Sequence, residues 1–415
     1  MPFAVFNFVN SIIGAGIIGL PFALDEAGFI AGVALLLFIA IITNYSVQLL
    51  VSLGVRYQNT DYEALCRVAF GRAGFFIISM SMFLFAYGAM CGYLIIIGDT
   101  LTVGLRTVVK VWGKFSSEPP SYVRELVILG TSCVFVLPLS LVRDIAKLGR
   151  SSFVSLIAVT WIVIAVTIRC FTGVEAELRP SGSDRTLEVI DKNFFPAIGV
   201  FSFAFICHHS SFLVFQSLEN NTSARWRKTA NISISTATVA CLVLSLTGYL
   251  TFRGRTEGDL LNNYSITDDL MNFTRVCFAL TMVLTFPMEI FVARHSVHAM
   301  VFGNGGITYG RHLAISFLLF GTAVGVALLT DNLGIVLELT GSFSATILGF
   351  IMPAALHFKL TGAPMRWSGG WAAFKAWAPP FGLLVFGVVA MLVSTTTTIV
   401  NAAQGEDSDN GDNNV

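Results

Sequence analysis

Eleven apolar stretches of about 20 residues each run through this chain of 415 residues. Only 12% of the residues are charged, against roughly 25% in an average soluble protein, so no soluble fold could bury this much apolar surface. The stretches are too long for barrel strands, and a helix satisfies its own backbone hydrogen bonds in lipid. The sequence therefore predicts an all-α polytopic membrane protein. The stretches centre near Gly14, Leu37, Ala86, Val134, Val159, Phe203, Val243, Leu284, Phe320, Ile347 and Val388.

The loops between these stretches differ in charge. If the N-terminus is cytosolic, the inner loops carry more Lys and Arg than the outer loops, and most acidic residues lie outside. The positive-inside rule then predicts a cytosolic N-terminus and an extracellular or lumenal C-terminus. A formal net charge of zero argues against a nucleic-acid partner.

Two of the apolar stretches are interrupted, and they lie five stretches apart. The first contains Gly14, Gly16, Gly19 and Pro21, and the sixth contains the polar cluster 207–211, "CHHSS". This pattern indicates a five-plus-five inverted repeat over roughly residues 1–170 and 193–358, with an extra helix at 378–401. We expect residues 1–401 to form one transmembrane domain, followed by an acidic polar tail at 402–415. The sequence does not indicate an oligomeric state.

The glycines of the first stretch have a chemical consequence. Where the helix unwinds at Gly14-Ala15-Gly16, the N–H groups of the next half-helix lose their partners and face the gap with the positive end of the helix dipole. A substrate carboxylate fits there, and glycine permits its close approach. Carbonyls of the preceding half-helix, with Asn10 or Ser11, could coordinate a cation. The alternative is that the glycines form a face for helix packing.

Four segments of the chain carry a resemblance to a known family. They read "FNFVNSIIGAGIIGLPFALDEAG", "AFGRAGFFIISMSMFLFAYGAMCGYLIIIGDTL", "FAFICHHSSFLVFQSLEN" and "LTFPMEIFVARHSV". The chain resembles the amino acid/auxin permease family, particularly the sodium-coupled neutral amino acid transporters (solute carrier family 38). Its CHH and PME elements are most similar to the branch with transporter 11 and fungal vacuolar transporters. This resemblance implies eleven spans, a repeat of the leucine-transporter type, broken first and sixth helices, and alternating access.

The resemblance also implies a sodium site. It would use Asn10 and a threonine of the eighth span, Thr281 or Thr285, which share a helix face because they are four residues apart. Such hydroxyls suit sodium, although a threonine in a membrane helix often bonds its own helix instead. If the coupling ion is a proton, Glu289 becomes the leading coupling residue, because a charge inside the membrane is costly. No cofactor and no other metal is expected.

Two further acids fall within or near the spans. Asp99 could simply reach the outer interface, whereas Glu338 could pair within the bundle or cap the outer mouth. In the outer loops, Asn263 heads an Asn-Tyr-Ser sequon and is a candidate for glycosylation.

The predicted substrate site combines the broken helices with a wall of the third span. Neighbouring residues of a helix point about 100° apart, so His208 and His209 could chelate one metal only if the helix unwinds there. We expect one histidine, His208, to face the pathway and the other to pack behind it. Tyr87 and Tyr93 of the third span could wall the site or simply fill the core. The full predicted set is Ser11, Ile13, Gly14, Ala15, Gly16, Tyr87, Phe205 and His208.

These residues predict a secondary active transporter of neutral L-amino acids, coupled to sodium or protons. It would reside in the plasma membrane or in a vacuolar or lysosomal membrane. A vacuolar or lysosomal exporter of the same fold, a channel and an intramembrane metalloenzyme are the alternatives. A further expectation is that Gly16→Val folds normally and loses substrate binding.

Overall fold

The structure is a computed structural model that describes residues 2–109, 121–142, 151–175, 178, 189–191, 193–303, 305–362 and 370–412. Within these ranges, ten helices are long and apolar enough to cross a membrane, and a bent pair at the start supplies an eleventh span. The described residues form no strand. The prediction of an all-helical polytopic membrane protein is therefore confirmed.

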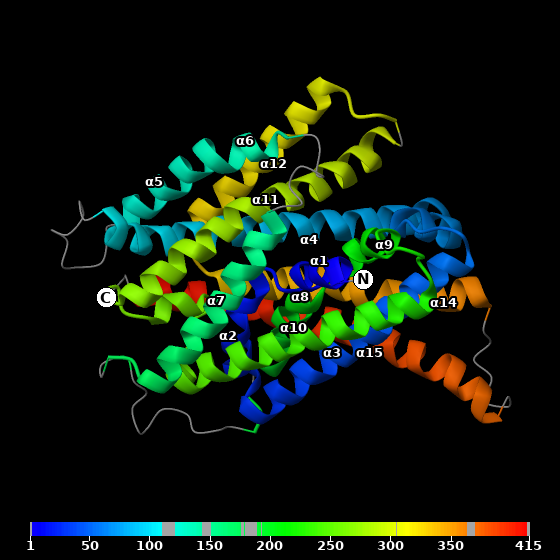
Figure 1. Cartoon of the computed structure of the whole chain (residues 1–415), viewed down its shortest axis with the longest axis horizontal. Helices are drawn as coiled ribbons and strands as arrows, with labels where there is room; N and C mark the ends of the chain where they lie inside the picture. Colours follow the sequence, from blue (N-terminus) through cyan, green and yellow to red (C-terminus); the bar gives the residue numbers. More distant parts are fainter. Residues whose placement is uncertain are drawn as a thin grey trace.

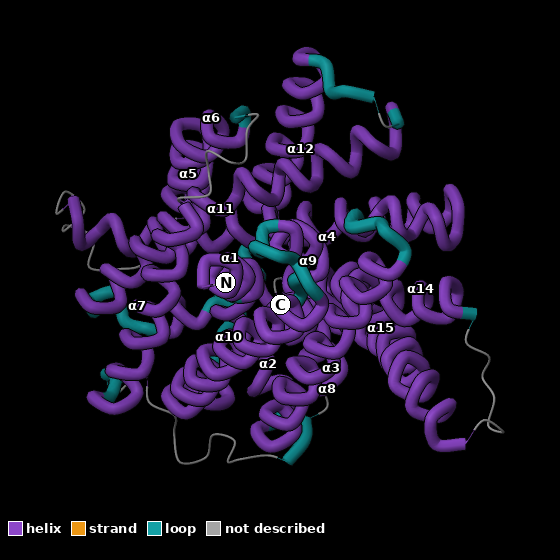
Figure 2. The backbone as a smooth tube through the Cα atoms, turned by 45° about the vertical axis from the view of Figure 1, so that its right-hand side comes forward, coloured by secondary structure: helices purple, strands orange, loops and turns teal. Residues whose placement is uncertain are grey.

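The helices run mostly along the long axis of the molecule, which is horizontal in Figure 1. Helices make up nearly all of the described chain, with loops between them drawn in teal in Figure 2. The α-helices are α1 (Pro2–Ile12), α2 (Leu20–Ala27), α3 (Phe29–Arg56), α4 (Tyr62–Val109), α5 (Ser121–Thr131), α6 (Leu137–Ser140), α7 (Ser151–Thr172), α8 (Phe194–Phe205), α9 (His208–Gln216), α10 (Ser223–Phe252), α11 (Asp269–Phe302), α12 (Tyr309–Leu329), α13 (Leu333–Leu339), α14 (Met352–Thr361) and α15 (Gly370–Asp412).

Shorter helical turns interrupt or join these elements. The 3₁₀ turn η1 (Ala15–Gly19) lies between α1 and α2, and η6 (Leu260–Asn263) lies between α10 and α11. Span 10 contains two π-helical turns, η7 (Thr340–Ala345) and η8 (Ile347–Ile351). Such turns often occur at functional sites.

The first and sixth spans are both broken, as predicted. In the first span, the halves on either side of residues 13–14 bend by 46°, and Gly14 is extended with φ −101° and ψ −151°. In the sixth span, α8 ends at Phe205 and α9 begins at His208, with Ile206 extended between them. The two breaks lie five spans apart, which is the spacing that the five-plus-five repeat requires.

Close contact between backbones fixes the broken spans in the bundle. A Cβ atom on Gly16 would lie 2.9 Å from the Cα of Ala204, so η1 rests directly on α8. A Cβ atom on Gly341 would overlap the carbonyl of Gly199, so η7 also rests directly on α8. Small residues of this kind let membrane helices pack at short range. The sixth span is thereby held between the first span and the tenth.

The final helix, α15, extends beyond the expected 378–401. It begins at Gly370 and continues to Asp412, so the first part of the polar tail is helical. It packs against α8, α13 and α14. The eleventh span therefore contacts both the sixth and the tenth.

Candidate substrate site at the two helix breaks

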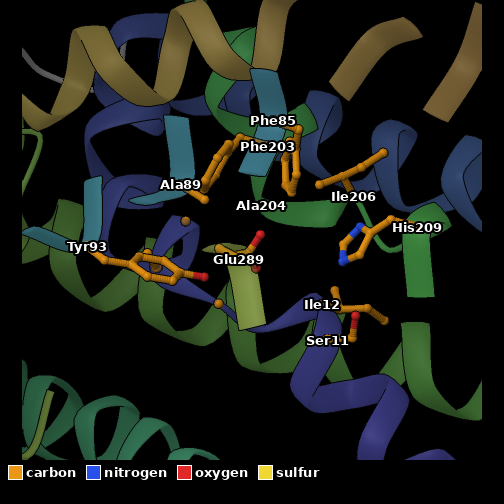
Figure 3. Close-up of a pocket in the computed structure, with 13 residues that line it drawn as sticks. Ser11, Ile12, Phe85, Ala89, Tyr93, Phe203, Ala204, Ile206, His209 and Glu289 are labelled. Carbon is orange, nitrogen blue, oxygen red and sulfur yellow. The ribbon is translucent and has the colours of Figure 1, made fainter. Parts of the chain in front are cut away.

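A small cavity of about 30 Å³ lies between the breaks of the first and sixth spans. Walls from α4 and α11 complete it (Figure 3). This volume has room for about two water molecules, less than any amino acid needs. A substrate could enter only if the surrounding helices move apart. The residues that line the cavity are Ser11, Ile12, Gly14, Ala15, Gly16, Phe85, Ala89, Tyr93, Phe203, Ala204, Ile206, His209 and Glu289.

Free backbone donors face this cavity from the first span. The N–H groups of Ala15 and Gly16 begin the 3₁₀ turn η1 and donate to no acceptor among the described residues. The N–H of Gly14 donates to the carbonyl of Ile12 instead. Two adjacent donors at the start of a helical turn suit a carboxylate.

The α1 half of the first span and the α9 half of the sixth are joined by a hydrogen bond. The hydroxyls of Ser11 on α1 and Ser210 on α9 lie 2.5 Å apart. The Ser210 hydroxyl also reaches the carbonyl of Cys207, 3.0 Å away. This bond holds the two breaks side by side at the cavity.

One carboxylate enters the cavity from the eighth span. Glu289 of α11 borders the cavity near its centre in Figure 3 and remains partly accessible. The hydroxyl of Tyr93 on α4 interacts with this carboxyl group. The same hydroxyl would lie 3.8 Å from a Cβ atom on Gly14. Glu289 and Tyr93 therefore stand across the cavity from the broken first span.

The remaining wall is apolar and aromatic. Phe85 of α4 packs against Phe203 of α8, with ring centroids 5.1 Å apart, and against the His209 ring at 5.6 Å. Ala89 and Ile206 complete this side of the cavity. Such a wall suits an uncharged side chain of a ligand.

The structure brings together five of the predicted substrate and coupling residues. Ser11, Gly14, Ala15, Gly16 and Glu289 all line the cavity. The other substrate candidates, Ile13, Tyr87, Phe205 and His208, lie beside it in sequence but do not line it.

The two histidines of the sixth span exchange their expected places. His208 is fully buried, and its Nε2 atom lies 3.1 Å from the hydroxyl of Ser46 on α3. His209 borders the cavity instead. The expectation that His208 faces the pathway is therefore corrected, because the break before His208 resets the direction in which the next helix faces.

Aromatic residues of the third span show the same kind of correction. Tyr87 packs against Phe83 with tilted rings, interacts with Thr322 of α12 and does not line the cavity. Tyr93 takes the expected position in the wall. Six residues of helix rotate the side chain by about 600°, which leaves the two tyrosines on different faces.

The proposed sodium residues Asn10, Thr281 and Thr285 do not line the cavity, and a sodium site formed by them stays a prediction. The hydroxyls of Thr281 and Thr285 donate to the carbonyls of Cys277 and Thr281, at 3.0 Å and 2.9 Å. These bonds use the hydroxyl protons and leave oxygen lone pairs that could still accept a cation. Asn10 is half-buried on α1 and does not line the cavity. Glu289 is the coupling candidate that shares the cavity with the first break.

Two further expectations change with the geometry. A valine at Gly16 would collide with Phe203 and with the backbone of Ala204, so Gly16→Val would disturb folding as well as binding.

The Asn263 side chain donates to the carbonyl of Arg255 and accepts from the N–H of Glu257. Its amide is thus used within the loop, and its glycosylation stays a prediction.

Sequence reasoning missed several residues that line the cavity. Phe85, Ala89, Phe203, Ala204 and Ile206 are ordinary apolar residues of membrane spans, so their composition carries no signal. The spacing of three lining residues on α4 does carry a signal. Phe85, Ala89 and Tyr93 are four residues apart and share a face of α4.

Comparison with known proteins identifies the family. A family model described as "Transmembrane amino acid transporter protein" matches residues 1–400. The chain belongs to this transmembrane amino acid transporter family. It is 39% identical over 403 residues to the mouse protein named "Putative sodium-coupled neutral amino acid transporter 11", covering 96% of this chain and 84% of the relative. The human protein of that name is 37% identical over 377 residues, covering 90% of each.

A fungal relative belongs to the same family of transporters. The chain is 30% identical over 421 residues to vacuolar amino acid transporter 2 of Saccharomyces cerevisiae, covering 98% of this chain and 85% of the relative. These relatives are named as transporters, so the chain is an integral membrane transport protein and not an enzyme. The resemblance found in the sequence is confirmed.

Proposed function

We propose that this transporter moves neutral L-amino acids across the membrane by alternating access, coupled to a cation gradient. The observation that carries the proposal is the cavity at the two helix breaks. Free N–H groups, one carboxylate and an apolar wall all line this cavity. Each of these three features matches one group of a neutral amino acid.

The backbone donors of Ala15 and Gly16 would bind the substrate carboxylate. Glu289, interacting with Tyr93, would receive the ammonium group or the coupling proton. The wall formed with Phe85, Phe203, Ile206 and other residues would accept the uncharged side chain. Since the cavity is smaller than an amino acid, the helices around it must separate for entry.

The coupling ion has two candidates. A proton is supported by the position of Glu289 in the same cavity as the free backbone donors. Sodium is supported by the printed names of the animal relatives and by the available lone pairs of Thr281 and Thr285. Asn10 would join the sodium site only after a movement of α1, because it lies outside the cavity.

We also propose that the N-terminus faces the cytosol and the C-terminus faces the outside or a lumen. Arg56, Arg225, Arg294 and Lys359 lie at the end of the bundle assigned to the cytosol. The opposite end holds the acids Asp99, Asp259, Asp268 and Asp331, together with Arg124 and Arg169, which pair with Asp99 and Asp268. The positive-inside rule supports this orientation through the modest excess of Lys and Arg in the loops of the first end. The membrane is the plasma membrane or, as the name of the yeast relative supports, a vacuolar or lysosomal one, where the protein would act as an exporter.

Counterflow in proteoliposomes tests the proposal. A panel of radiolabelled amino acids should show exchange of neutral L-amino acids and little of charged ones. Imposed sodium and pH gradients, applied separately, then identify the coupling ion. If the ion is a proton, Glu289→Gln should keep exchange and lose uphill uptake driven by pH. Absence of amino acid exchange in a monodisperse, folded preparation would contradict the proposed function.

A further inference from the structure

A buried carboxylate lies outside the substrate cavity, between spans 10 and 11. Glu338 of α13 is 6% exposed and does not line the cavity. Among the described residues, its one hydrogen bond comes from the hydroxyl of Thr398 on α15, at 3.0 Å. No Lys or Arg of the described part of the chain forms an ion pair with it. A buried carboxylate without a cation is costly, so this environment calls for a positive partner.

Hydroxyls around Glu338 lack partners. Ser342 follows Glu338 by about one helical turn, and Ser394 precedes Thr398 by one turn on α15. Both are completely buried, and neither hydroxyl has a hydrogen-bond partner in the described residues. The hydroxyl of Thr395 on α15 is likewise buried and unpartnered.

Many other hydroxyls in the spans bond within their own helix, although Ser132, Ser155, Thr229 and Ser245 are also buried without partners, each in a different place from Glu338 along the chain. Thr100, Thr238 and Thr397, for example, donate to the carbonyl one turn earlier in their own helices. That bond is the ordinary way for a hydroxyl to be satisfied in a membrane helix. Buried polar atoms without partners are rare and often mark a missing water or ion.

The backbone around Glu338 is shaped to bring these groups together. The π-helical turn η7 carries Ser342, and its Gly341 touches the backbone of α8 at Gly199. A Cβ atom on Gly199 would overlap the Ser342 hydroxyl and the carbonyl of Glu338. On α8 one turn further along, Ser202 is also buried with an unpartnered hydroxyl. Oxygen atoms from spans 6, 10 and 11 therefore converge on one region.

Polar residues connect this region to the end of the bundle that holds the outer acids. Glu26 of α2 contributes a negative charge beside Glu338 and accepts a hydrogen bond from Asn193, at 3.1 Å. Asn193 in turn accepts from Asn401 of α15, at 3.4 Å, and Asn401 is exposed. A cation could approach along this negative, polar route without crossing the substrate cavity.

We propose that Glu338, Ser342, Ser394 and Thr398 form a sodium-binding site, separate from the substrate cavity and from the sodium residues on spans 1 and 8. A carboxylate with several hydroxyl oxygens is a hard-oxygen ligand set, which suits a small cation such as sodium. A proton would neutralise Glu338 but leave the hydroxyls of Ser342 and Ser394 unsatisfied. Sodium binding would join the tenth and eleventh spans beside the sixth.

Equilibrium binding of ²²Na⁺ to the purified full chain, without amino acid and at constant pH, tests this site. Glu338→Gln keeps the shape of the side chain and removes its charge, and should weaken sodium binding at least about tenfold. The double variant Ser342→Ala with Ser394→Ala should also weaken it while Glu338 remains. Thr397→Val is the matched control on α15, because Thr397 bonds its own helix. It should bind sodium as the wild type does.

Thr285→Ala separates this site from a coupling site on span 8. Sodium binding that is weakened by Glu338→Gln and kept by Thr285→Ala supports the proposal, whether or not the protein transports amino acids. Binding unchanged in Glu338→Gln, or lost only in Thr285→Ala, overturns it. A thermal stability that depends on pH through Glu338 and ignores sodium also overturns it, because the ligand would then be a proton. Size-exclusion profiles confirm that each variant is folded.

Discussion

Gly14 and Gly16 lie two residues apart in the same helix break, yet a methyl group should affect them differently. The Cβ atom of alanine at position 14 would lie 3.8 Å from the Tyr93 hydroxyl, an ordinary contact inside the cavity. The backbone of Gly14, with φ −101°, suits any residue. At position 16 the same atom would lie 2.8 Å from Phe203 and 2.9 Å from the Ala204 backbone.

The expected magnitudes follow from these contacts. Gly14→Ala places a methyl group beside the donors proposed for the substrate carboxylate. Loss of one hydrogen bond to a charged group costs about 1.5–3 kcal/mol, which raises the apparent Kd about ten- to a hundredfold. The folded state should lose no stability, since replacing glycine at a compatible position reduces the freedom of the unfolded chain. Gly16→Ala should instead destabilise the protein by about 1–3 kcal/mol through overpacking.

Two measurements on purified protein separate these effects. Substrate affinity comes from binding of a radiolabelled neutral amino acid, and stability comes from thermal unfolding in detergent. Gly321→Ala on α12 is the control, because its Cβ atom would meet no atom within 4 Å. It should change neither quantity. If Gly14→Ala binds substrate with unchanged affinity, the carboxylate does not use this break, and the proposed binding mode is wrong.

Three further predictions concern side chains that the structure separates. Tyr93→Phe should raise the KM up to about tenfold by removing one hydrogen bond, while Tyr87→Phe leaves it unchanged; uptake assays check this. His208→Ala should lower the Tm because it removes the hydrogen bond to Ser46 and leaves a cavity at a fully buried position. His209→Ala should widen selectivity toward larger side chains, measured in a competition panel. The pKa of Asp259 is raised from 3.8 to about 7, mainly by burial and also by the negative charges of Asp99 and Glu257. The hydrogen bond from the Leu261 N–H and the charge of Arg275 lower it by less. Because the folded state holds this proton more tightly, the segment 256–268 should be most stable below about pH 4 and lose stability as the pH rises to 7. Hydrogen exchange, corrected for intrinsic rates, should show stronger protection at pH 5 than at pH 8, and Asp259→Asn should remove that difference.

The spans and their breaks could be predicted from the sequence because their signals add up over many residues. About 20 apolar residues identify a span, and clustered glycines or polar residues inside it identify a break. Ser11, Gly14, Ala15 and Gly16 were found in this way, since they are the break itself. Glu289 was found because a carboxylate inside a span is rare.

The direction in which side chains point beyond a break could not be predicted from the sequence. Within an unbroken helix each residue turns by about 100°, but the extended Ile206 and the non-helical Cys207 reset that rotation between α8 and α9. His209 rather than His208 therefore lines the cavity. The contacts of α9 with α1, α3, α4 and η8 decide this orientation, and these contacts join residues far apart in the sequence.

The contacts around the two breaks also indicate which parts would move together in the proposed transport cycle. The halves η1 with α2 and α8 are joined by close packing, because Gly16 rests on Ala204, and a Cβ atom on Gly19 would lie 3.4 Å from Val200. The other two halves, α1 and α9, are joined by the hydrogen bond between Ser11 and Ser210. The halves of each pair therefore contact one another, while the non-helical backbone at the breaks joins one pair to the other. Widening the cavity by turning the pair α1 and α9 against the other pair would then keep both sets of contacts and change only the dihedral angles at the breaks.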